Sequence, residues 1–244
     1  MSSARLPGPL GAQSWPWQQT VEAGSGVLRL GAPPAPVGTG TVLRPRASPI
    51  EPEVRLLAAV AYGEASTGNV YEEMAAIANV LARQRAARGY ADMRSFMSTD
   101  RDFAYAAHDG NRRFRRFQRA SADDIAADPG MSAALRAARN ALSPAGIDYS
   151  NGAYFWDGAD IRSNYEGHSK VQRGIRFSDP AHNIYAIQEK DVPKEHWLTN
   201  AAGQKIRLRG RWDYVYESTA AYGGTIFWRL NPDFVQATGN RVHQ

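Results

Sequence analysis

The sequence predicts an α+β fold, with helices in the first half of its globular part and short antiparallel strands in the second. Three observations lead to this prediction. Between residues 48 and 142, apolar residues recur at spacings of three and four and follow helix-start signals. After residue 142, the apolar runs are short, rich in β-branched and aromatic residues, and bounded by Gly, Asn, Asp or Pro. Helices that precede the strands, instead of alternating with them, are typical of an α+β domain.

The chain divides into an N-terminal segment and one large domain. Eight of the 14 prolines stand before residue 50, and residues 1–47 show no hydrophobic periodicity. We therefore expect an extended Pro/Gly-rich segment there, which would be a linker, a tail held on the surface, or a docking tail for a carrier or partner. Residues 48–244 are long enough to bury a sizeable core, and we expect one domain with a β-rich extension from about residue 160.

Composition excludes several classes of protein. Hydrophobic residues make up 43% of the 244 positions and charged residues 22%, which rules out disorder of the whole chain. Cysteine is absent, so disulfides, zinc–cysteine sites and thiol catalysis are excluded. No apolar run reaches the ~18 residues of a membrane span. The net charge of +5 favours an anionic partner, which charge alone does not identify among nucleic acid, membrane and acidic polymer.

Two helices are predicted at the start of the domain. The first begins at a capping-box pattern in residues 48–51 and runs to about Ala65. The second begins with Asn69 as N-cap and Glu72 as its capping partner, and it ends near Gly89. Further helical pieces are expected at 92–98, 103–108 and 131–142, the last after the start signal Asp128-Pro129.

Short strands are predicted in the second half. They cover residues 154–156, 184–187, 205–208, 212–217 and 225–228. Gly223-Gly224, just before the last of them, is predicted to be a hairpin turn.

Glu64 is the strongest candidate for a catalytic residue. It closes the apolar face that Val54, Leu57 and Ala61 begin at helical spacing. A carboxyl group on such a face is partly desolvated, which raises its pKa and suits it to act as a general acid. The structural alternatives are an exposed position at a frayed helix end or a pairing with an arginine.

Several segments resemble a family of cell wall hydrolases. They are 61–65 (Ala-Tyr-Gly-Glu-Ala), 71–72 (Tyr-Glu), 75–81 (Ala-Ala-Ile-Ala-Asn-Val-Leu), 103–110 (Phe-Ala-Tyr-Ala-Ala-His-Asp-Gly) and 148–156 (Asp-Tyr-Ser-Asn-Gly-Ala-Tyr-Phe-Trp). In order and approximate spacing they are similar to the signature of the family typified by the spore-cortex-lytic enzymes, over about residues 53–160. The resemblance implies a lysozyme-like fold, cleavage of peptidoglycan glycan strands by a muramidase or lytic transglycosylase, and Glu64 as the catalytic glutamate.

Other residues are candidates for binding the substrate or assisting Glu64. Aromatic faces pack on sugar rings, so Tyr105, Tyr154 and Trp156 are candidates to line a sugar groove, although core packing would also explain them. Asp109 is a further substrate-binding candidate. The candidates for a second carboxylate are Glu72, Glu73, Asp109 and Glu166. Capping explains Glu72, a solvated helix position explains Glu73, and a turn before Gly110 explains Asp109, so none of them is a convincing partner.

We expect no metal and no cofactor. His168, His182 and His196 recur at intervals of 14, but no pair of them has the i, i+4 spacing of a helical zinc site and no cysteine supports them.

Two other functions remain open. Residues 112–119 place five Arg around two Phe, which fits a solvated basic helix, attraction to an anionic wall, or binding of nucleic acid. A nucleic-acid-binding protein is thus one alternative, although the segment matches no known motif, and a non-catalytic wall-binding module is the other.

The interpretation as a cell wall hydrolase also predicts where the protein is made and where it acts. The N-terminus lacks the apolar region of a secretory signal, so we expect synthesis in the cytoplasm and action in the periplasm or cell wall after non-classical export or lysis. This suits a phage lysin or a secreted antibacterial toxin, and a toxin would need a dedicated immunity protein as inhibitor.

Residues 1–47 are predicted to be dispensable for folding, since the helix-start signals come after them. A chain of residues 48–244 should therefore melt in one cooperative transition, which calorimetry would measure. A broad, non-cooperative transition would contradict this prediction.

Overall fold

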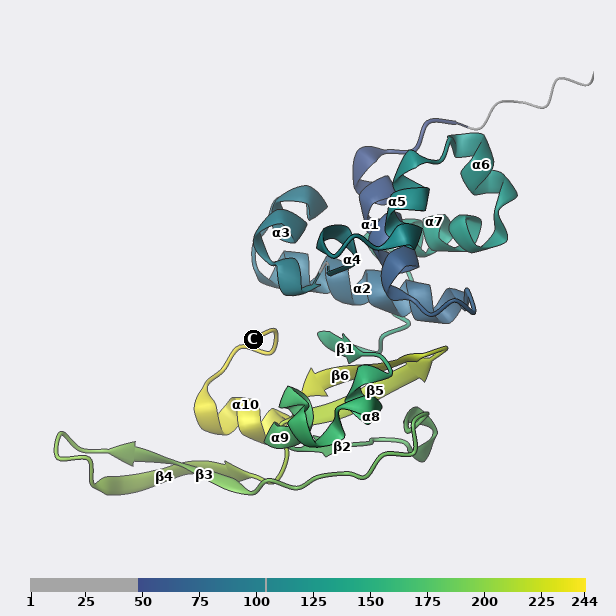
Figure 1. The fold of residues 1–244 in the computed structure, drawn as a ribbon. Coiled ribbons are helices and arrows are strands. Elements are labelled where there is room, and N and C mark those ends of the chain that lie inside the picture. Colours follow the sequence, from purple (N-terminus) through teal and green to yellow (C-terminus); the bar gives the residue numbers. More distant parts are fainter. Residues whose placement is uncertain (1–47, 104) are drawn as a thin grey trace, which may run out of the picture. The chain divides into compact units, whose positions relative to one another are not determined.

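A computed structural model of the chain describes residues 48–103 and 105–244 (Figure 1). Its contacts divide the chain between Arg44 and Pro45, and the fold described below is that of the second unit. The extended segment expected over residues 1–47 lies outside the described residues. No helix among the described residues is long and apolar enough to cross a membrane. The unit is a mixed α+β structure, as the sequence predicts.

Helices form the first half of the unit. They are α1 (Pro52–Glu64), α2 (Tyr71–Ala87), α3 (Met93–Thr99), α4 (Tyr105–His108), α5 (Arg112–Arg119), α6 (Ala122–Ala127) and α7 (Pro129–Leu142), with a 3-10 turn η1 (Arg101–Phe103). The helix α1 packs against α2, α5 and α7. Small side chains allow this close packing, because α1 and α2 each contribute three fully buried alanines, namely Ala58, Ala59 and Ala61 from α1 and Ala75, Ala76 and Ala78 from α2.

The predicted start of α1 is wrong by three residues. The helix begins at Pro52, and Glu51 is an extended N-cap residue with no side-chain cap bond. Proline is tolerated in the first turn but not in a helix interior, and it forces the preceding residue out of the helical conformation. Pro52 therefore determines where α1 begins, three residues after the start that the pattern at 48–51 predicts.

The predicted cap of α2 is also wrong. The helix begins at Tyr71 after Val70, without a side-chain cap, and Glu72 is exposed. Asn69 has a left-handed φ of 54°, and its side chain accepts a hydrogen bond from Arg113 (2.8 Å). Tertiary contact with α5 thus replaces the local capping interaction.

A four-stranded sheet follows the helices. Its order is β1 (Phe155–Asp157), β6 (Thr225–Leu230), β5 (Tyr216–Tyr222) and β2 (Ile175–Arg176). Its pairings are antiparallel, as predicted, except that β2 runs parallel to β5. Gly223 and Gly224 form the predicted hairpin turn between β5 and β6, with Gly223 at a φ of 57°. Between β1 and β2 lie the short helices α8 (Asp160–Ser163) and α9 (Ser169–Arg173), with the 3-10 turn η2 (Tyr165–Gly167), and a further 3-10 turn η3 (Pro180–His182) follows β2.

Two predicted strands are not formed as expected. Residues 184–187 form a turn, in which the Asn183 side chain bonds the backbone N–H and C=O of Ile187. The stretch 212–217 is split, since β4 ends at Trp212 and β5 begins at Tyr216. In both places side-chain or turn geometry overrides β propensity, which depends strongly on context.

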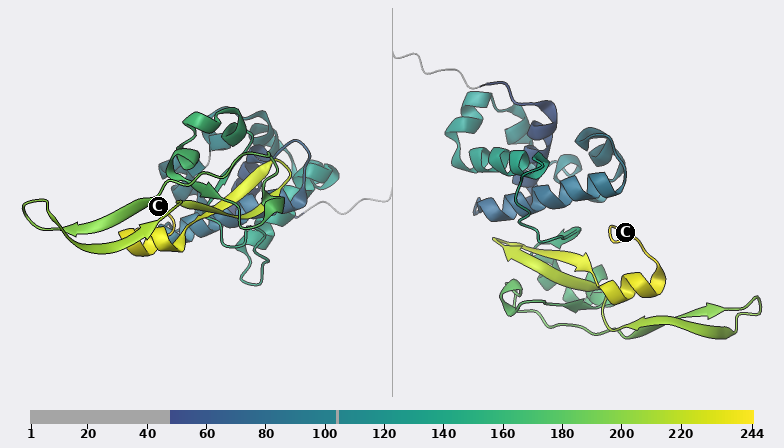
Figure 2. Two further views of the ribbon diagram at one scale, coloured as in Figure 1. Left: turned by 90° about the horizontal axis from the view of Figure 1, so that it is seen from below. Right: turned by 180° about the vertical axis from the view of Figure 1, so that it is seen from behind.

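A separate two-stranded ribbon extends beyond the sheet (Figure 2). It consists of β3 (Lys194–Thr199) and β4 (Lys205–Trp212), and β4 packs on the last helix, α10 (Pro232–Thr238). A Cβ atom at Gly210 would lie 2.6 Å from that of Ala237, so glycine is required for this close approach.

Glu73 connects the helices to the sheet. The prediction of a solvated position is wrong, because Glu73 is fully buried. Its carboxylate accepts hydrogen bonds from two atoms of Ser66, a residue in the loop after α1, namely the backbone N (3.1 Å) and Oγ (2.6 Å). It also accepts from Gly224 N (3.0 Å) and Thr225 Oγ1 (2.8 Å) at the β5–β6 hairpin. A buried carboxylate needs such donors to offset its desolvation.

We predict that Glu73→Ala lowers the stability by roughly 2–4 kcal/mol, because it leaves several donors without an acceptor. For a domain of this size the melting temperature should fall by about 5–15 °C. The exposed neighbour Glu72 provides the matched control, and Glu72→Ala should change the stability by no more than about 0.5 kcal/mol. Equal effects of the two substitutions would show that Glu73 does not hold the two layers together.

Candidate active site

Glu64 is the last residue of α1, and close packing of α4 on α1 buries much of its side chain. Its Oε1 accepts a hydrogen bond from the backbone N–H of Ala106 in α4 (2.6 Å). Gly63 makes this approach possible, since a Cβ atom at that position would lie 2.8 Å from the Cβ of Ala106. The Gly-Glu pair at the end of α1 therefore has a steric reason.

The pKa of Glu64 is raised above its usual value of 4.5. Burial is the main cause, and the negative charge of Asp109 adds to it, whereas the hydrogen bond from Ala106 acts in the opposite direction. No arginine contacts this carboxylate among the described residues. Burial thus favours the protonated form of Glu64, and neither structural alternative, an exposed helix end or an arginine pair, describes its surroundings.

Glu64 lies in the wall of two cavities that share it and Trp156, and we call them together the Glu64 groove. The larger cavity has a volume of about 590 Å³ and is lined by Glu64, Ser66, Tyr105, Trp156, Asp157, Gly158, Ala159, Asp160, Tyr185, Gly224 and Thr225. The smaller one, of about 230 Å³, is lined by Glu64, Asp102, Phe103, Phe155, Trp156 and Lys170. An acid with a raised pKa thus faces a groove that combines aromatic and carboxylate side chains.

The groove contains two of the predicted aromatic residues. Tyr105 is 65% exposed, which leaves its ring free to contact a ligand. Trp156 belongs to β1 and has its ring 6.3 Å from that of Phe103. Tyr185 adds a third aromatic side chain, fixed by a hydrogen bond from its hydroxyl to Gly224 O (2.5 Å). The role of these rings in sugar binding stays a prediction.

Tyr154 does not line the groove. Its ring lies against Arg83 (5.6 Å) and His243 (6.5 Å), on the side of α2 and the C-terminus. The reason is the backbone before β1, where Tyr154 O accepts a hydrogen bond from Gln84 in α2. The expectation that Tyr154 and Trp156 share a sugar groove is therefore wrong.

The three remaining carboxylate candidates do not line the groove either. Asp109 is exposed in the turn after α4, where it accepts a hydrogen bond from Asn111 N, as the turn interpretation predicts. It acts on Glu64 only through its charge. Glu166 is 85% exposed and pairs loosely with Lys190 (3.8 Å). Glu72 is exposed at the start of α2.

Sequence reasoning missed several residues of the groove. Asp157, Asp160 and Tyr185 line it, and Ser66 and Thr225 lie there because Glu73 holds them. Asp157-Gly158, directly after an aromatic strand, was a usable signal for a polar strand end. Nothing in the local sequence marked Tyr185.

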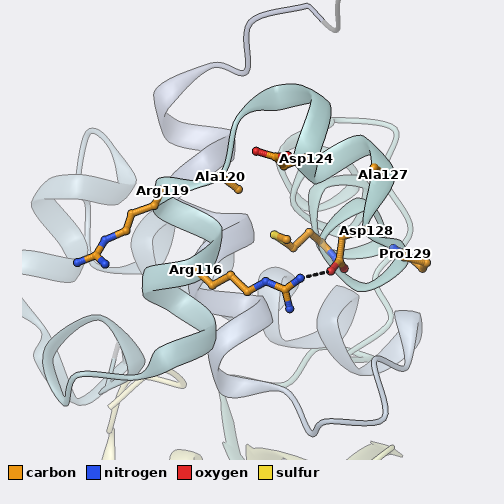
Figure 3. Close-up of a pocket in the computed structure, with 8 residues that line it drawn as sticks. Arg116, Arg119, Ala120, Asp124, Ala127, Asp128 and Pro129 are labelled. Carbon is orange, nitrogen blue, oxygen red and sulfur yellow. Dashed lines mark hydrogen bonds and ion pairs between the residues drawn. The ribbon is translucent and has the colours of Figure 1, made fainter.

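A further cavity, of about 680 Å³, lies between α5, α6 and α7 (Figure 3). Its acidic residues already have structural roles. Asp128 caps α7 and pairs with Arg116 (2.7 Å), as Figure 3 shows, and Asp124 forms a capping box with Ser121. This cavity therefore offers no acid comparable with Glu64.

The basic segment 112–119 is helix α5, and its phenylalanines face the core, since Phe117 is fully buried. Arg113 is half-buried and donates to Tyr62 O, Ser66 O and Asn69 Oδ1. It therefore supports the α1–α2 loop, which leaves four exposed arginines, namely Arg112, Arg115, Arg116 and Arg119.

Comparisons with known proteins identify no relative: no family model, no curated protein and no solved structure matches the chain.

We predict that Glu64 makes folding less favourable as the pH rises. The folded protein holds the Glu64 proton more tightly than the unfolded chain does, so stability is lost from about pH 4.5 upward to the folded-state pKa. Glu64→Gln removes this loss. Relative to the parent protein, the variant should gain stability between pH 4 and pH 7 in urea denaturation.

Glu72→Gln, which changes an exposed acid at the start of α2, serves as the control and should not reproduce this gain. A Glu64→Gln variant that loses stability relative to the parent over the same range would indicate a stabilising, ionised Glu64 instead.

Proposed function

We propose that this protein cleaves the glycan strands of peptidoglycan, with Glu64 as the general acid. The observation that carries the proposal is a partly buried carboxyl group of raised pKa in a groove flanked by Tyr105 and Trp156. The resemblance of residues 53–160 to the cell wall hydrolases points to the same reaction and to a lysozyme-like arrangement of the helices around Glu64.

Cleavage begins with proton transfer from Glu64 to the oxygen of a glycosidic bond held in the groove. The bond then breaks through an oxocarbenium-like transition state. A general acid needs its proton at the working pH, and burial of Glu64 raises its pKa in this direction. Aromatic rings on both cavities would hold the sugar rings by packing on their C–H faces.

The second step can follow two routes. A hydrolase needs a second carboxylate to activate water or to attack the sugar, whereas a lytic transglycosylase uses one glutamate and a hydroxyl of the sugar itself. Of the acids in the groove, Asp157 is engaged by Lys170 and His168. Asp102 and Asp160 are exposed. Products of cleavage distinguish the routes, because only transglycosylation gives a 1,6-anhydro sugar.

The charge of the protein and the route by which it would reach the wall are further parts of the proposal. The net charge of +5 and the exposed arginines of α5 suit attraction to an anionic cell wall. Action on the wall would follow non-classical export or lysis, as for a secreted toxin or phage lysin, and an immunity protein would act by blocking the Glu64 groove.

Glu64→Gln is predicted to lower the rate of glycan cleavage by ~10²–10⁴, because glutamine keeps the shape of the side chain but donates no catalytic proton. Release of soluble fragments from purified sacculi, with mass spectrometry of the products, measures this loss. Glu72→Gln, which changes an exposed acid on the neighbouring helix, should retain full activity.

A fully active Glu64→Gln variant would refute the assignment. A parent protein that sediments with sacculi but releases no fragments would instead favour the non-catalytic wall-binding module.

A further inference from the structure

A second cluster of ionisable side chains lies on one wall of the Glu64 groove. Asp157 ends β1, Asp160 begins α8, and His168 precedes α9. His168 Nε2 lies 3.3 Å from Asp157 Oδ1 and 3.4 Å from Asp160 Oδ2. One nitrogen or oxygen atom from each of the three residues lies within 4.8 Å of the other two. The two aspartates also line the groove.

The imidazole of His168 is nearly buried but poorly satisfied. Its side chain is 9% exposed, and its Nδ1 has no hydrogen-bond partner among the described residues. Asp157 is 8% exposed, and its Oδ2 also lacks a partner. Buried polar atoms are rarely left in this state, so these two call for an explanation.

The placement of the three groups suits a shared cation. His168 Nε2 lies within reach of one carboxylate oxygen from each aspartate, and Asp157 still has its Oδ2 without a hydrogen-bond partner among the described residues. A cation held between the imidazole nitrogen and the two carboxylates would have three ligands of suitable type.

The distances fit metal ligands better than hydrogen bonds. A charged N–H···O bond to a carboxylate is usually about 2.7–2.9 Å long. Zinc at ~2.0–2.1 Å from tetrahedral nitrogen and oxygen ligands separates those ligands by about 3.3–3.4 Å. The distances from His168 Nε2 to the two aspartates, 3.3 and 3.4 Å, match this spacing. One imidazole and two carboxylates are also ordinary zinc ligands.

Lys170 bears on the charge of the cluster. Its Nζ lies 2.8 Å from Asp157 Oδ1, so it neutralises one of the two carboxylates. Asp157, Asp160 and Lys170 together carry a net charge of −1, which attracts a dication. Lys170 also fixes the orientation of Asp157, as groups around metal ligands commonly do.

We propose that Asp157, Asp160 and His168 bind a divalent transition-metal ion of the zinc class on the wall of the Glu64 groove. Three protein ligands leave one tetrahedral position for a water molecule or a ligand. Asp157 and Asp160 line the groove, so the bound ion would lie at its wall. The sequence concealed the site, since the partners of His168 are aspartates 8 and 11 residues before it and not another histidine.

The test uses the full chain without an affinity tag, freed of metal by a chelator. Titration calorimetry with ZnCl₂ should show one saturable site. Zinc at about 100 times the dissociation constant should raise the melting temperature by about 5–10 °C. CoCl₂ in place of zinc should give the visible absorption bands of a four-coordinate ion.

Asp160→Asn is the decisive variant, because Asp160 has a 67% exposed side chain and its substitution should leave the fold intact. It should raise the dissociation constant for zinc at least ~10-fold and, at the same zinc concentration, reduce the melting shift to about half or less. The control is Glu166→Gln, which changes an 85% exposed acid outside the cluster and should bind zinc like the parent. Absence of saturable binding by the parent, or binding unchanged in Asp160→Asn, would overturn the proposal.

Discussion

One buried carboxylate, that of Glu73, determines how the floor of the Glu64 groove is built. Ser66 from the loop after α1 and Gly224 with Thr225 from the β5–β6 hairpin all donate hydrogen bonds to it. These donors come from segments about 150 residues apart in the chain. The hairpin fits closely around the carboxylate, because a Cβ atom at Gly223 would lie 2.3 Å from Glu73 Oε2. The helices and the sheet are therefore joined by polar contacts at the place where the groove lies.

Glu64 and Glu73 are two glutamates near the groove whose surroundings differ. Glu73 has four hydrogen-bond donors, which offset the cost of burying its charge. Glu64 has one, from the backbone of Ala106, and burial outweighs it in setting the pKa. Glu73 therefore holds the hairpin and the loop after α1 together, whereas Glu64 lies in the groove wall with a raised pKa.

The second half of the chain contributes the polar wall of the groove. The strand β1 carries Trp156 and Asp157 side by side, and its pairing with β6 fixes both, Trp156 opposite Phe227 and Asp157 opposite Ile226. The helices α8 and α9 then bring Asp160, His168 and Lys170 to Asp157. Trp156, a candidate for contact with a sugar, and Asp157, a proposed metal ligand, thus share one short strand. Their proximity means that an ion bound there would lie beside whatever occupies the groove.

The sequence by itself determined the features that depend on local patterns. Helical periodicity identified α1, α2 and α7, the Gly-Gly pair gave the β5–β6 turn, and the apolar face that ends at Glu64 marked the candidate acid. The start of α1 is also a local feature, because Pro52 disfavours the helical conformation at Glu51.

Only the tertiary structure decided which side chains meet. Glu73 reads as a solvated helix residue until the distant hairpin supplies its donors, and Tyr154 reads as a partner of Trp156 until Gln84 of α2 holds its backbone. The Asp157–Asp160–His168 cluster depends on the path of the chain through α8 and α9. Burial, charge pairing and hydrogen bonding between segments distant in sequence are set by packing, and a local pattern therefore predicts a helix or a turn more reliably than the environment of a carboxylate.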